Sequence, residues 1–164
     1  MQRLPPRTLA ILAALLAAAA LCFAYASEIW GELVPCALCL AERWPYRGVI
    51  VLGLLAAMAP SRLVIPLLCL AIAALLAGAA VAAVHVGVEF HWWPSPLPEC
   101  AAPHLSGSIA ERLASMPARP SKPCDEPTFL IPGLPLSMAA MNLLFALAFA
   151  AALAIGLLGR RGTR

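Results

Sequence analysis

Three long apolar segments without a charged residue constrain this chain more than any other feature of its sequence. They run from Thr8 to Ser27, from Leu63 to Val88 and from Pro127 to Gly159. The hydrocarbon core of a bilayer is about 30 Å thick, and an α-helix needs about 20 apolar residues to cross it. Each segment is long enough, so the sequence predicts an integral membrane protein in contact with the lipid bilayer.

The composition excludes the main alternatives. Apolar residues make up 63% of the chain, against roughly 45–50% in soluble domains, and charged residues make up 12%, about half the usual share. Disordered chains have the opposite composition. A soluble globule of 164 residues could not bury this much apolar surface. The net charge of +3 is small and scattered, so nucleic-acid binding is not expected.

A shorter apolar segment follows the first one. The uncharged stretch from Gly48 to Pro60 is too short to span a bilayer, but extending it back to Trp44 adds a helical turn. Arg47 would then lie at the helix end, where a long basic side chain can reach the interface. We expect an all-α membrane protein, a four-transmembrane-helix bundle forming one membrane domain over 1–164, with helices at about 8–27, 44–60, 63–87 and 137–158. Ser137 is expected to cap the last helix.

The placement of basic residues predicts the orientation. Lysine and arginine accumulate in short cytoplasmic segments of membrane proteins. Six arginines lie in the two termini and beside Pro60, whereas all acidic residues lie in the loops 28–43 and 88–136. We therefore expect a multi-pass protein with both termini in the cytoplasm and both loops outside it.

The N-terminus also has features of a signal peptide. Arg3 and Arg7 precede the apolar run, and Ala24-Tyr25-Ala26 resembles a cleavage site. The apolar run is longer than the usual ~7–15 residues, which favours an uncleaved helix. The rest of the topology is the same for both alternatives.

The second loop is the one long polar segment. Ten of the sixteen prolines lie between residues 94 and 135, so we expect mostly irregular backbone. Ser108 and Glu111 have capping-box spacing, which predicts a short amphipathic helix there. Its apolar face would lie on the membrane surface or pack on the protein itself. That face is formed by Ile109, Leu113 and Met116.

The six cysteines sort by compartment. Two lie within apolar segments, where a thiol behaves as a small hydrophobic group, and we assign them no redox role. The other four form one pair in each outer loop. Disulfides form and persist outside the cytoplasm, so two disulfides are the natural interpretation. The cysteines of the apolar segments are Cys22 and Cys69, and the loop pairs are Cys36 with Cys39 and Cys100 with Cys124.

The first loop pair is a Cys-x-x-Cys motif, Cys36–Cys39. This spacing is typical of redox-active pairs, in which the pKa of one thiol can be depressed. If the pair opens the helix that follows, the partial positive charge at the helix start favours a thiolate. Arg43 adds positive charge nearby, whereas Glu32 and Glu42 oppose it.

The second loop pair allows more than one role. Closing a loop of this size with a disulfide contributes about 3 kcal/mol to stability. A proline-rich, exposed loop would also leave the Cys100–Cys124 disulfide mobile and accessible to the thiolate of another protein. The spacing leaves both roles open. A zinc site formed with His85, His91 and His104 is disfavoured, because structural zinc sites usually use two close pairs, and no metal is expected.

A redox pair at a membrane surface needs an electron acceptor or donor. The chain has no haem motif, no dinucleotide fingerprint and no cysteine run for an iron–sulfur cluster. The acceptor is then another thiol or a lipid-soluble carrier such as a quinone. Arg43 could donate a hydrogen bond to a quinone carbonyl, or act only as an interfacial anchor. His85 could bond a carbonyl, donate a proton, or be merely interfacial.

The segment Cys36–Arg43, just before the second apolar helix, closely resembles the family of disulfide bond formation protein B, DsbB. The likeness extends over nearly the whole chain, from the Cys-x-Leu-Cys loop through the long two-cysteine loop. His85–Glu89 ahead of Trp92-Trp93 resembles the end of the family's third helix, and Phe129–Asn142 resembles the start of its fourth. Met141 departs from the tryptophan that the family often has there.

This resemblance implies a protein-disulfide oxidoreductase of the bacterial inner membrane, with its cysteine loops in the periplasm. A DsbA-like thioredoxin-fold partner would attack Cys100 of the Cys100–Cys124 disulfide. Electrons would pass to the Cys36–Cys39 pair and then to ubiquinone or menaquinone. Cys39 would face the membrane quinone, and Cys36 would exchange with the loop. Arg43, and less clearly His85, would bind the quinone.

Three rival functions are weighed against this one. A quinone reductase of the vitamin K epoxide reductase type also uses four helices and two cysteine pairs, but in the reverse order along the chain. A DsbI-type paralogue would serve a dedicated partner. A disulfide- or zinc-stabilised membrane scaffold would have no activity. Metal analysis and thiol trapping distinguish the scaffold from the enzymes.

Overall fold

The computed structural model describes residues 4–100, 108–110, 122–130, 133 and 135–159. These residues form helices and no strand, apart from one isolated bridge between Phe129 and Ser137. The expected all-α fold class is therefore confirmed for the described part of the chain. The helices are α1 (Pro6–Ile29), α2 (Ala37–Ala41), α3 (Arg43–Met58), α4 (Ser61–Glu89), the 3-10 turn η1 (Pro98–Cys100) and α6 (Met138–Leu158).

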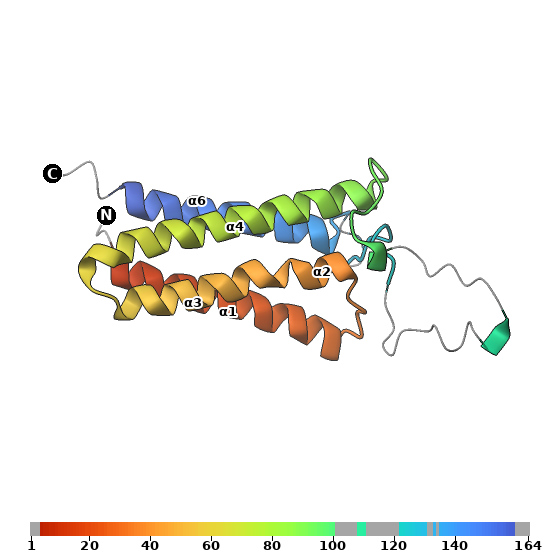
Figure 1. Cartoon of the computed structure of the whole chain (residues 1–164), viewed down its shortest axis with the longest axis horizontal. Helices are drawn as coiled ribbons and strands as arrows, with labels where there is room; N and C mark the ends of the chain where they lie inside the picture. The colour runs from red at the N-terminus through yellow and green to blue at the C-terminus, as the bar shows by residue number, and fades with distance from the viewer. Residues whose placement is uncertain (1–3, 101–107, 111–121, 131–132, 134, 160–164) are drawn as a thin grey trace.

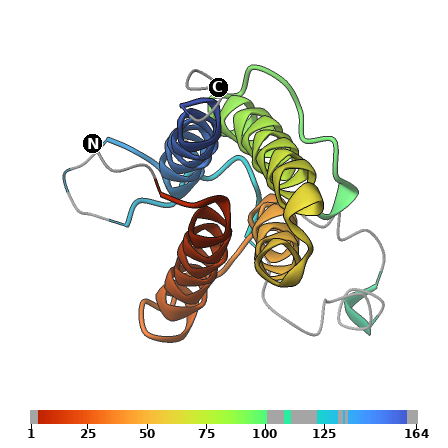
Figure 2. The ribbon, with the colours of Figure 1, turned by 90° about the vertical axis from the view of Figure 1, so that its left-hand side faces the viewer.

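The four long helices lie side by side along one axis (Figure 1). Helix α3 packs between α1 and α4, and α4 packs against α6, as the end view in Figure 2 also shows. The start of α1, the turn at Pro60 and the end of α6 lie at one end of the bundle. Helix α2 and η1 lie at the other end. The up-and-down order thus brings both cysteine segments together.

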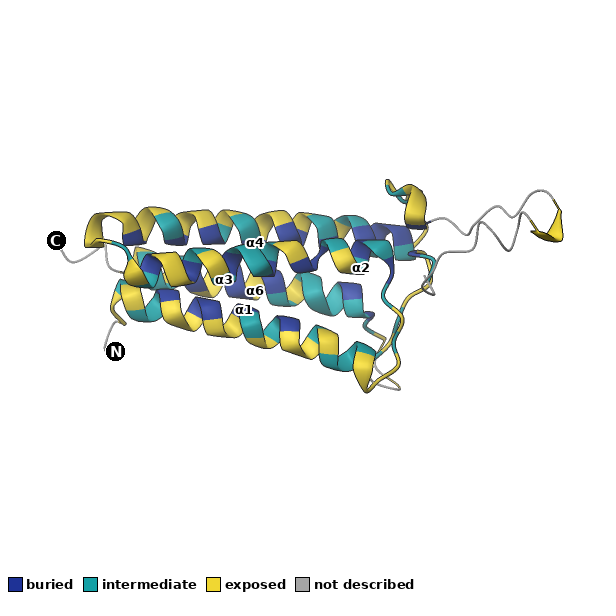
Figure 3. Ribbon diagram, turned by 60° about the horizontal axis from the view of Figure 1, so that its bottom comes forward, coloured by how far each residue is buried: buried dark blue, intermediate teal, exposed yellow. Residues whose placement is uncertain are grey.

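Three of these helices are long and apolar enough to cross a membrane: α1 with 24 residues, α4 with 29 and α6 with 21. Helix α3 has 16 residues, and its role as a fourth span remains a prediction. All four helices expose large apolar side chains. The ribbon in Figure 3 carries exposed residues, coloured yellow, along each of these helices. Examples are Leu15, Val51, Leu70 and Leu144.

Local sequence signals account for the helix ends. Helix α1 begins at Pro6, because proline fits the first turn of a helix. Helix α3 ends at Met58, because Ala59 precedes Pro60 and adopts an extended backbone. The expected cap of α6 is confirmed, since the Ser137 hydroxyl accepts a hydrogen bond from the Ala140 N–H at 3.1 Å.

Two expectations about the loops need revision. The sequence predicts a loop over residues 28–43, but α2 occupies part of this segment because the Cys36 thiol caps its first turn. The expected amphipathic helix falls mostly outside the described residues. Of its residues, Ile109 and Ala110 are helical, and Ile109 is exposed.

Small residues let α1 and α3 approach closely. A Cβ atom at Gly53 would lie 2.7 Å from the carbonyl oxygen of Ala10 and 3.0 Å from the Cβ of Ala14. Such small-residue contacts are the usual way in which membrane helices pack, because close approach increases van der Waals contact. The position of α3 against α1 therefore depends on Gly53.

The Gly53→Ala variant should unfold at a lower temperature in detergent than the unmodified protein. The new methyl group must displace the backbone of α1, which outweighs the gain of about 1 kcal/mol in helix propensity. Gly48→Ala is the matched control, because a Cβ at Gly48 meets no atom within 4 Å. It should be neutral or stabilising. Equal unfolding temperatures for the two variants would contradict the close contact.

Candidate active site

The two cysteine pairs meet at the end of the bundle that carries α2. Cys36, Cys100 and Cys124 are buried in one apolar cluster with Leu38 and Val88, and Cys39 packs against this cluster. Cys100 and Cys124 form a disulfide, with their Cα atoms 5.0 Å apart. The four loop cysteines therefore form a single group, although the two pairs lie far apart in the sequence.

The structure describes the loop disulfide in one of the two settings that the sequence leaves open. A proline-rich loop would allow a mobile, accessible disulfide, but Cys100 and Cys124 are 4% and 1% exposed. Apolar packing accounts for this burial, because Leu97 and Val88 lie in the same cluster. In this conformation the disulfide lies beside the Cys36–Cys39 pair rather than open to an external thiolate.

The Cys36 and Cys39 sulfur atoms are 3.0 Å apart. Cys36 precedes α2, and its sulfur accepts a hydrogen bond from the Cys39 backbone N–H at 3.2 Å. The hydrogen bond from the Cys39 thiol lowers the pKa of Cys36, although burial and the charge of Glu42 oppose this shift. The pKa of Cys39 is raised by the same hydrogen bond and by burial. The reduced pair thus holds its thiolate more readily on Cys36, whereas the family resemblance assigns the quinone-facing thiolate to Cys39.

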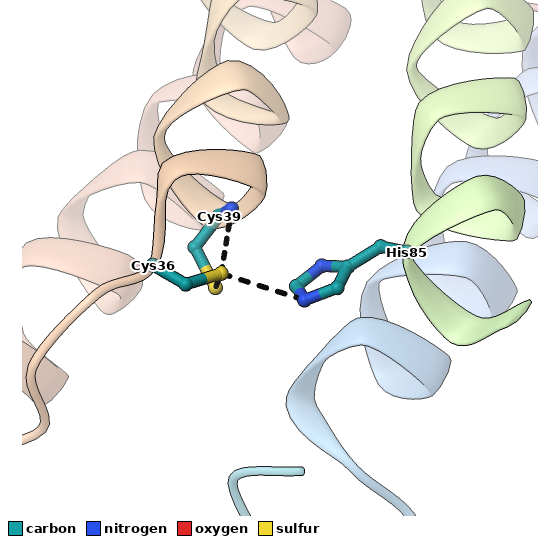
Figure 4. A group of neighbouring side chains, drawn as sticks. All are labelled: Cys36, Cys39 and His85. Carbon is teal, nitrogen blue, oxygen red and sulfur yellow. Dashed lines mark hydrogen bonds between the residues drawn. The ribbon is translucent and has the colours of Figure 1, made fainter. Parts of the chain in front are cut away.

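His85 joins the dithiol to Glu42. Figure 4 shows its ring extending from α4 toward the two cysteines. The Nε2 atom lies 3.4 Å from the Cys36 sulfur. The other ring nitrogen, Nδ1, lies 2.7 Å from Glu42 Oε1. His85 and Glu42 are 3% and 6% exposed. The interfacial alternative for His85 is therefore wrong.

Glu42 is also held by the last helix. Its Oε2 atom accepts a hydrogen bond from the Asn142 amide at 2.6 Å, and the Tyr46 hydroxyl donates to Asn142 Oδ1 at 2.6 Å. The sequence pattern presents Glu42 only as an opposing charge and gives no sign of Asn142 or Tyr46. The position of Glu42 beside the Cys-x-x-Cys motif is the one available signal.

Arg43 is buried and paired with Glu28 at the end of α1, and its guanidinium lies 4.8 Å from the centre of the Tyr25 ring. The role of Glu28 has no signal in the sequence. A guanidinium has five N–H donors, so pairing with one carboxylate uses only part of its hydrogen-bonding capacity.

A cavity of about 350 Å³ opens beside this cluster, between α1, α3 and α6. Its lining is mainly apolar and includes Leu16, Phe23 and Phe145. Its polar lining residues are Cys39, Glu42, Arg43, Tyr46 and Asn142. Cys36 and His85 are not among the lining residues.

A model of one protein family, described as disulfide bond formation protein DsbB, matches residues 6–156. This match covers nearly the whole chain. The chain belongs to the DsbB family. No curated protein and no solved structure matches it. As a DsbB family member with three helices fit to span a bilayer, it is a membrane oxidoreductase of disulfide-bond formation.

The DsbB match bears on the rival functions. The resemblance of the segment 36–43 to the DsbB family is confirmed, which counts against a vitamin K epoxide reductase type enzyme and against an inert scaffold. A zinc site made of all four loop cysteines does not fit the Cys100–Cys124 disulfide. The ligand atoms of Cys36, Cys39 and His85 lie within 4.8 Å of one another and could hold a metal ion when the pair is reduced.

In the reduced DsbB family protein, the Cys36 thiol should titrate below the pH of about 8.5 at which a free cysteine titrates. Cys39→Ala removes the thiol that donates to Cys36, so the titration midpoint of Cys36 should rise. The measurement is the pH dependence of Cys36 alkylation, read by mass spectrometry. Cys22→Ala is the control and should leave the midpoint in place. An unchanged midpoint in Cys39→Ala would show that the hydrogen bond does not stabilise the thiolate.

Proposed function

We propose that this protein is a quinone-reducing thiol oxidase that reoxidises a periplasmic DsbA-like thioredoxin-fold protein. Electrons pass through Cys100–Cys124, then through Cys36–Cys39, to ubiquinone or menaquinone. The observation that carries this proposal is the two-sided placement of the Cys-x-x-Cys pair. Cys36 packs against the loop disulfide, and Cys39 lines the apolar cavity.

The residues around the cavity fit a quinone. Ligand sites are typically apolar with a few polar groups that fix the orientation, and this cavity has its polar groups close together beside Cys39. Arg43 would donate hydrogen bonds to a quinone carbonyl, while the apolar side chains of α1 and α6 would contact the ring and tail. A bound quinone supplies an acceptor for two electrons and two protons. The DsbB family uses quinones, which supports this assignment.

The order of thiol exchange is carried over from the family resemblance, and the packing of Cys36, Cys100 and Cys124 in one cluster supports it. A thiolate of the partner attacks Cys100, forms a mixed disulfide and releases Cys124 as a thiolate. Cys124 then attacks Cys36, which breaks the Cys36–Cys39 bond and leaves the electron pair on Cys39, at the cavity. The second thiol of the partner then attacks the mixed disulfide and releases Cys100 as a thiolate. Cys100 attacks Cys124 of the Cys36–Cys124 bond, which restores the loop disulfide and leaves Cys36 reduced beside Cys39. Because Cys100 is buried, the first attack requires the loop disulfide to leave the apolar cluster.

The energetics of the partner require a strong acceptor. A DsbA-type dithiol has a reduction potential near −120 mV, and every ~30 mV uphill costs about 1.4 kcal/mol in a two-electron couple. A thiol pool such as glutathione is too reducing to reoxidise such a partner. The bacterial periplasm is kept oxidising by a chain of DsbA, DsbB and quinone, in which the quinone is the strong acceptor.

The proposed topology places the chemistry in the periplasm. Helices α1, α4 and α6, with α3 as a shorter fourth span, would put the cysteine end outside and the arginine-rich end in the cytoplasm of a bacterial inner membrane. Arg47 supports the α3 span, because its side chain donates to the Tyr25 hydroxyl at 2.7 Å and lies over the Trp44 ring. Aromatic and basic side chains of this kind favour the membrane interface.

The decisive assay follows quinol formation optically, with purified protein and a reduced DsbA-like donor. Quinol should form only when the donor is present, and Cys39→Ser should abolish the reaction because Cys39 supplies the one thiol among the residues lining the cavity. A variant with both Cys22→Ala and Cys69→Ala is the control and should keep full activity. Normal turnover by Cys39→Ser would contradict the proposed route. Turnover with one particular donor and not with others would favour a DsbI-type paralogue.

Arg43→Ala should raise the apparent KM for quinone at least about tenfold, since it removes a charge-assisted hydrogen bond, and should change kcat less. Arg47→Ala is the matched control. Arg47 lies one turn further along α3 and does not line the cavity. Steady-state kinetics with varied quinone would measure both. An unchanged KM in Arg43→Ala would make Arg43 an interfacial anchor.

A further inference from the structure

This inference rests on the proposed quinone reduction and concerns the route of a proton. Oxidation of two thiols to a disulfide releases two protons, and the quinone takes up two. Cys39 lines the cavity, so its proton has a direct route. Cys36 is 4% exposed and does not line the cavity. Its proton therefore needs a route through other side chains.

The neighbours of Cys36 supply such a route. The Cys36 sulfur lies 3.4 Å from His85 Nε2, and His85 Nδ1 lies 2.7 Å from Glu42 Oε1. Glu42 does line the cavity. Two hydrogen-bonded steps thus connect the buried thiol to the quinone site, as Figure 4 shows for the first of them. Thiol, imidazole and carboxylate stand in the order that activates nucleophiles in hydrolytic triads, where the third group orients the base.

We propose that His85 and Glu42 form a proton relay that carries the proton of the Cys36 thiol to the quinone cavity. His85 accepts the Cys36 proton at Nε2 and passes its Nδ1 proton to Glu42, which hands it to the quinone. The balanced reaction converts two thiols and one quinone into the Cys36–Cys39 disulfide and one hydroquinone. Both electrons come from the sulfur atoms, one proton comes through the relay, and the other leaves Cys39 directly.

The charges around the relay fit this role. Within the described residues, His85 is the one basic group within salt-bridge distance of Glu42. The neighbouring Arg43 pairs with Glu28 instead. The Glu42 carboxylate thus favours the imidazolium that forms when His85 takes a proton. Glu89, one turn along α4, adds a second acidic group facing His85. Among the described residues, Cys39 and Glu42 interact electrostatically with both His85 and Cys36.

Asn142 and Tyr46 act as positioning residues in this relay. The Asn142 amide holds Glu42 Oε2, and the Tyr46 hydroxyl orients that amide through Oδ1. With Oε2 held on the α6 side, Oε1 stays directed at His85. A buried polar network is rigid when each of its groups has a hydrogen-bond partner. In the described residues no buried side-chain nitrogen or oxygen lacks a hydrogen-bond partner.

The kinetic test compares Glu42→Gln and His85→Asn with the unmodified protein in the quinol assay. Both should lower kcat about 100-fold, the usual contribution of a positioned acid or base, and leave the KM for quinone within about twofold. Tyr46→Phe keeps the ring and removes only the hydroxyl, so it should lower kcat by roughly fivefold. Full kcat in Glu42→Gln or in His85→Asn overturns the relay. A raised KM with unchanged kcat also overturns it, because Glu42 would then only bind quinone.

Two matched controls separate the relay from general effects of charge. Glu32→Gln removes an exposed carboxylate of the first loop, and His91→Asn removes an exposed imidazole just beyond α4. Both should keep the kcat and KM of the unmodified protein. A 100-fold loss in either control would show that the loss in Glu42→Gln or His85→Asn is not specific to the relay, and would overturn it.

A second readout needs no quinone. In quinone-free reduced protein, His85→Asn should raise the pH midpoint of Cys36 alkylation, because Asn keeps an amide near Nδ1 but loses Nε2. An unchanged midpoint overturns the coupling of His85 to Cys36. If the unmodified protein forms no quinol but the midpoint shifts, the proposed function fails and the route to quinone with it, while the contact between thiol and imidazole stands. If quinol forms and the midpoint stays, the function stands and the relay fails.

Discussion

The cysteine end of the bundle depends on the hydrogen bonds of one buried carboxylate, that of Glu42. Its backbone joins α2 to α3, while one oxygen meets His85 on α4 and the other meets Asn142 on α6. A buried charge that loses its partner is strongly destabilising. Glu42 therefore links four helices, α2, α3, α4 and α6. As a consequence, the Cys-x-x-Cys pair at the start of α2 is placed between the loop disulfide and the cavity.

The same pair faces two environments, which is what electron transfer between a protein thiol and a lipid carrier requires. Cys36 belongs to an apolar cluster that also contains Cys100 and Cys124. Cys39 belongs to a cavity that opens between helices fit to lie in a bilayer. The separation is produced by a single helical turn. The loop disulfide is buried on the first side, in the same cluster as Cys36.

Local sequence patterns predict much of this fold, but they do not show contacts between residues that are distant in the sequence. The helix positions and the Ser137 cap follow from runs of apolar residues and from one hydroxyl, which neighbouring residues determine. The bonds from Glu42 to His85 and to Asn142 join residues 43 and 100 positions apart, so no local pattern shows them. For the same reason, the sequence does not show that the loop disulfide is buried. Its burial depends on an apolar cluster that gathers Val88 and Leu97 around the cysteines, not on the proline content of the loop.

The most direct test of the shared cysteine centre is the disulfide state of a protein with both Cys39→Ser and Cys100→Ser. Each pair then keeps one cysteine, the one that is proposed to exchange with the other pair. These two cysteines are Cys36 and Cys124. Mass spectrometry of the digested, non-reduced protein should find these two cysteines joined in one disulfide. Two free thiols in the folded, oxidised variant would contradict the account, because electrons could not pass from the Cys100–Cys124 pair to the Cys36–Cys39 pair.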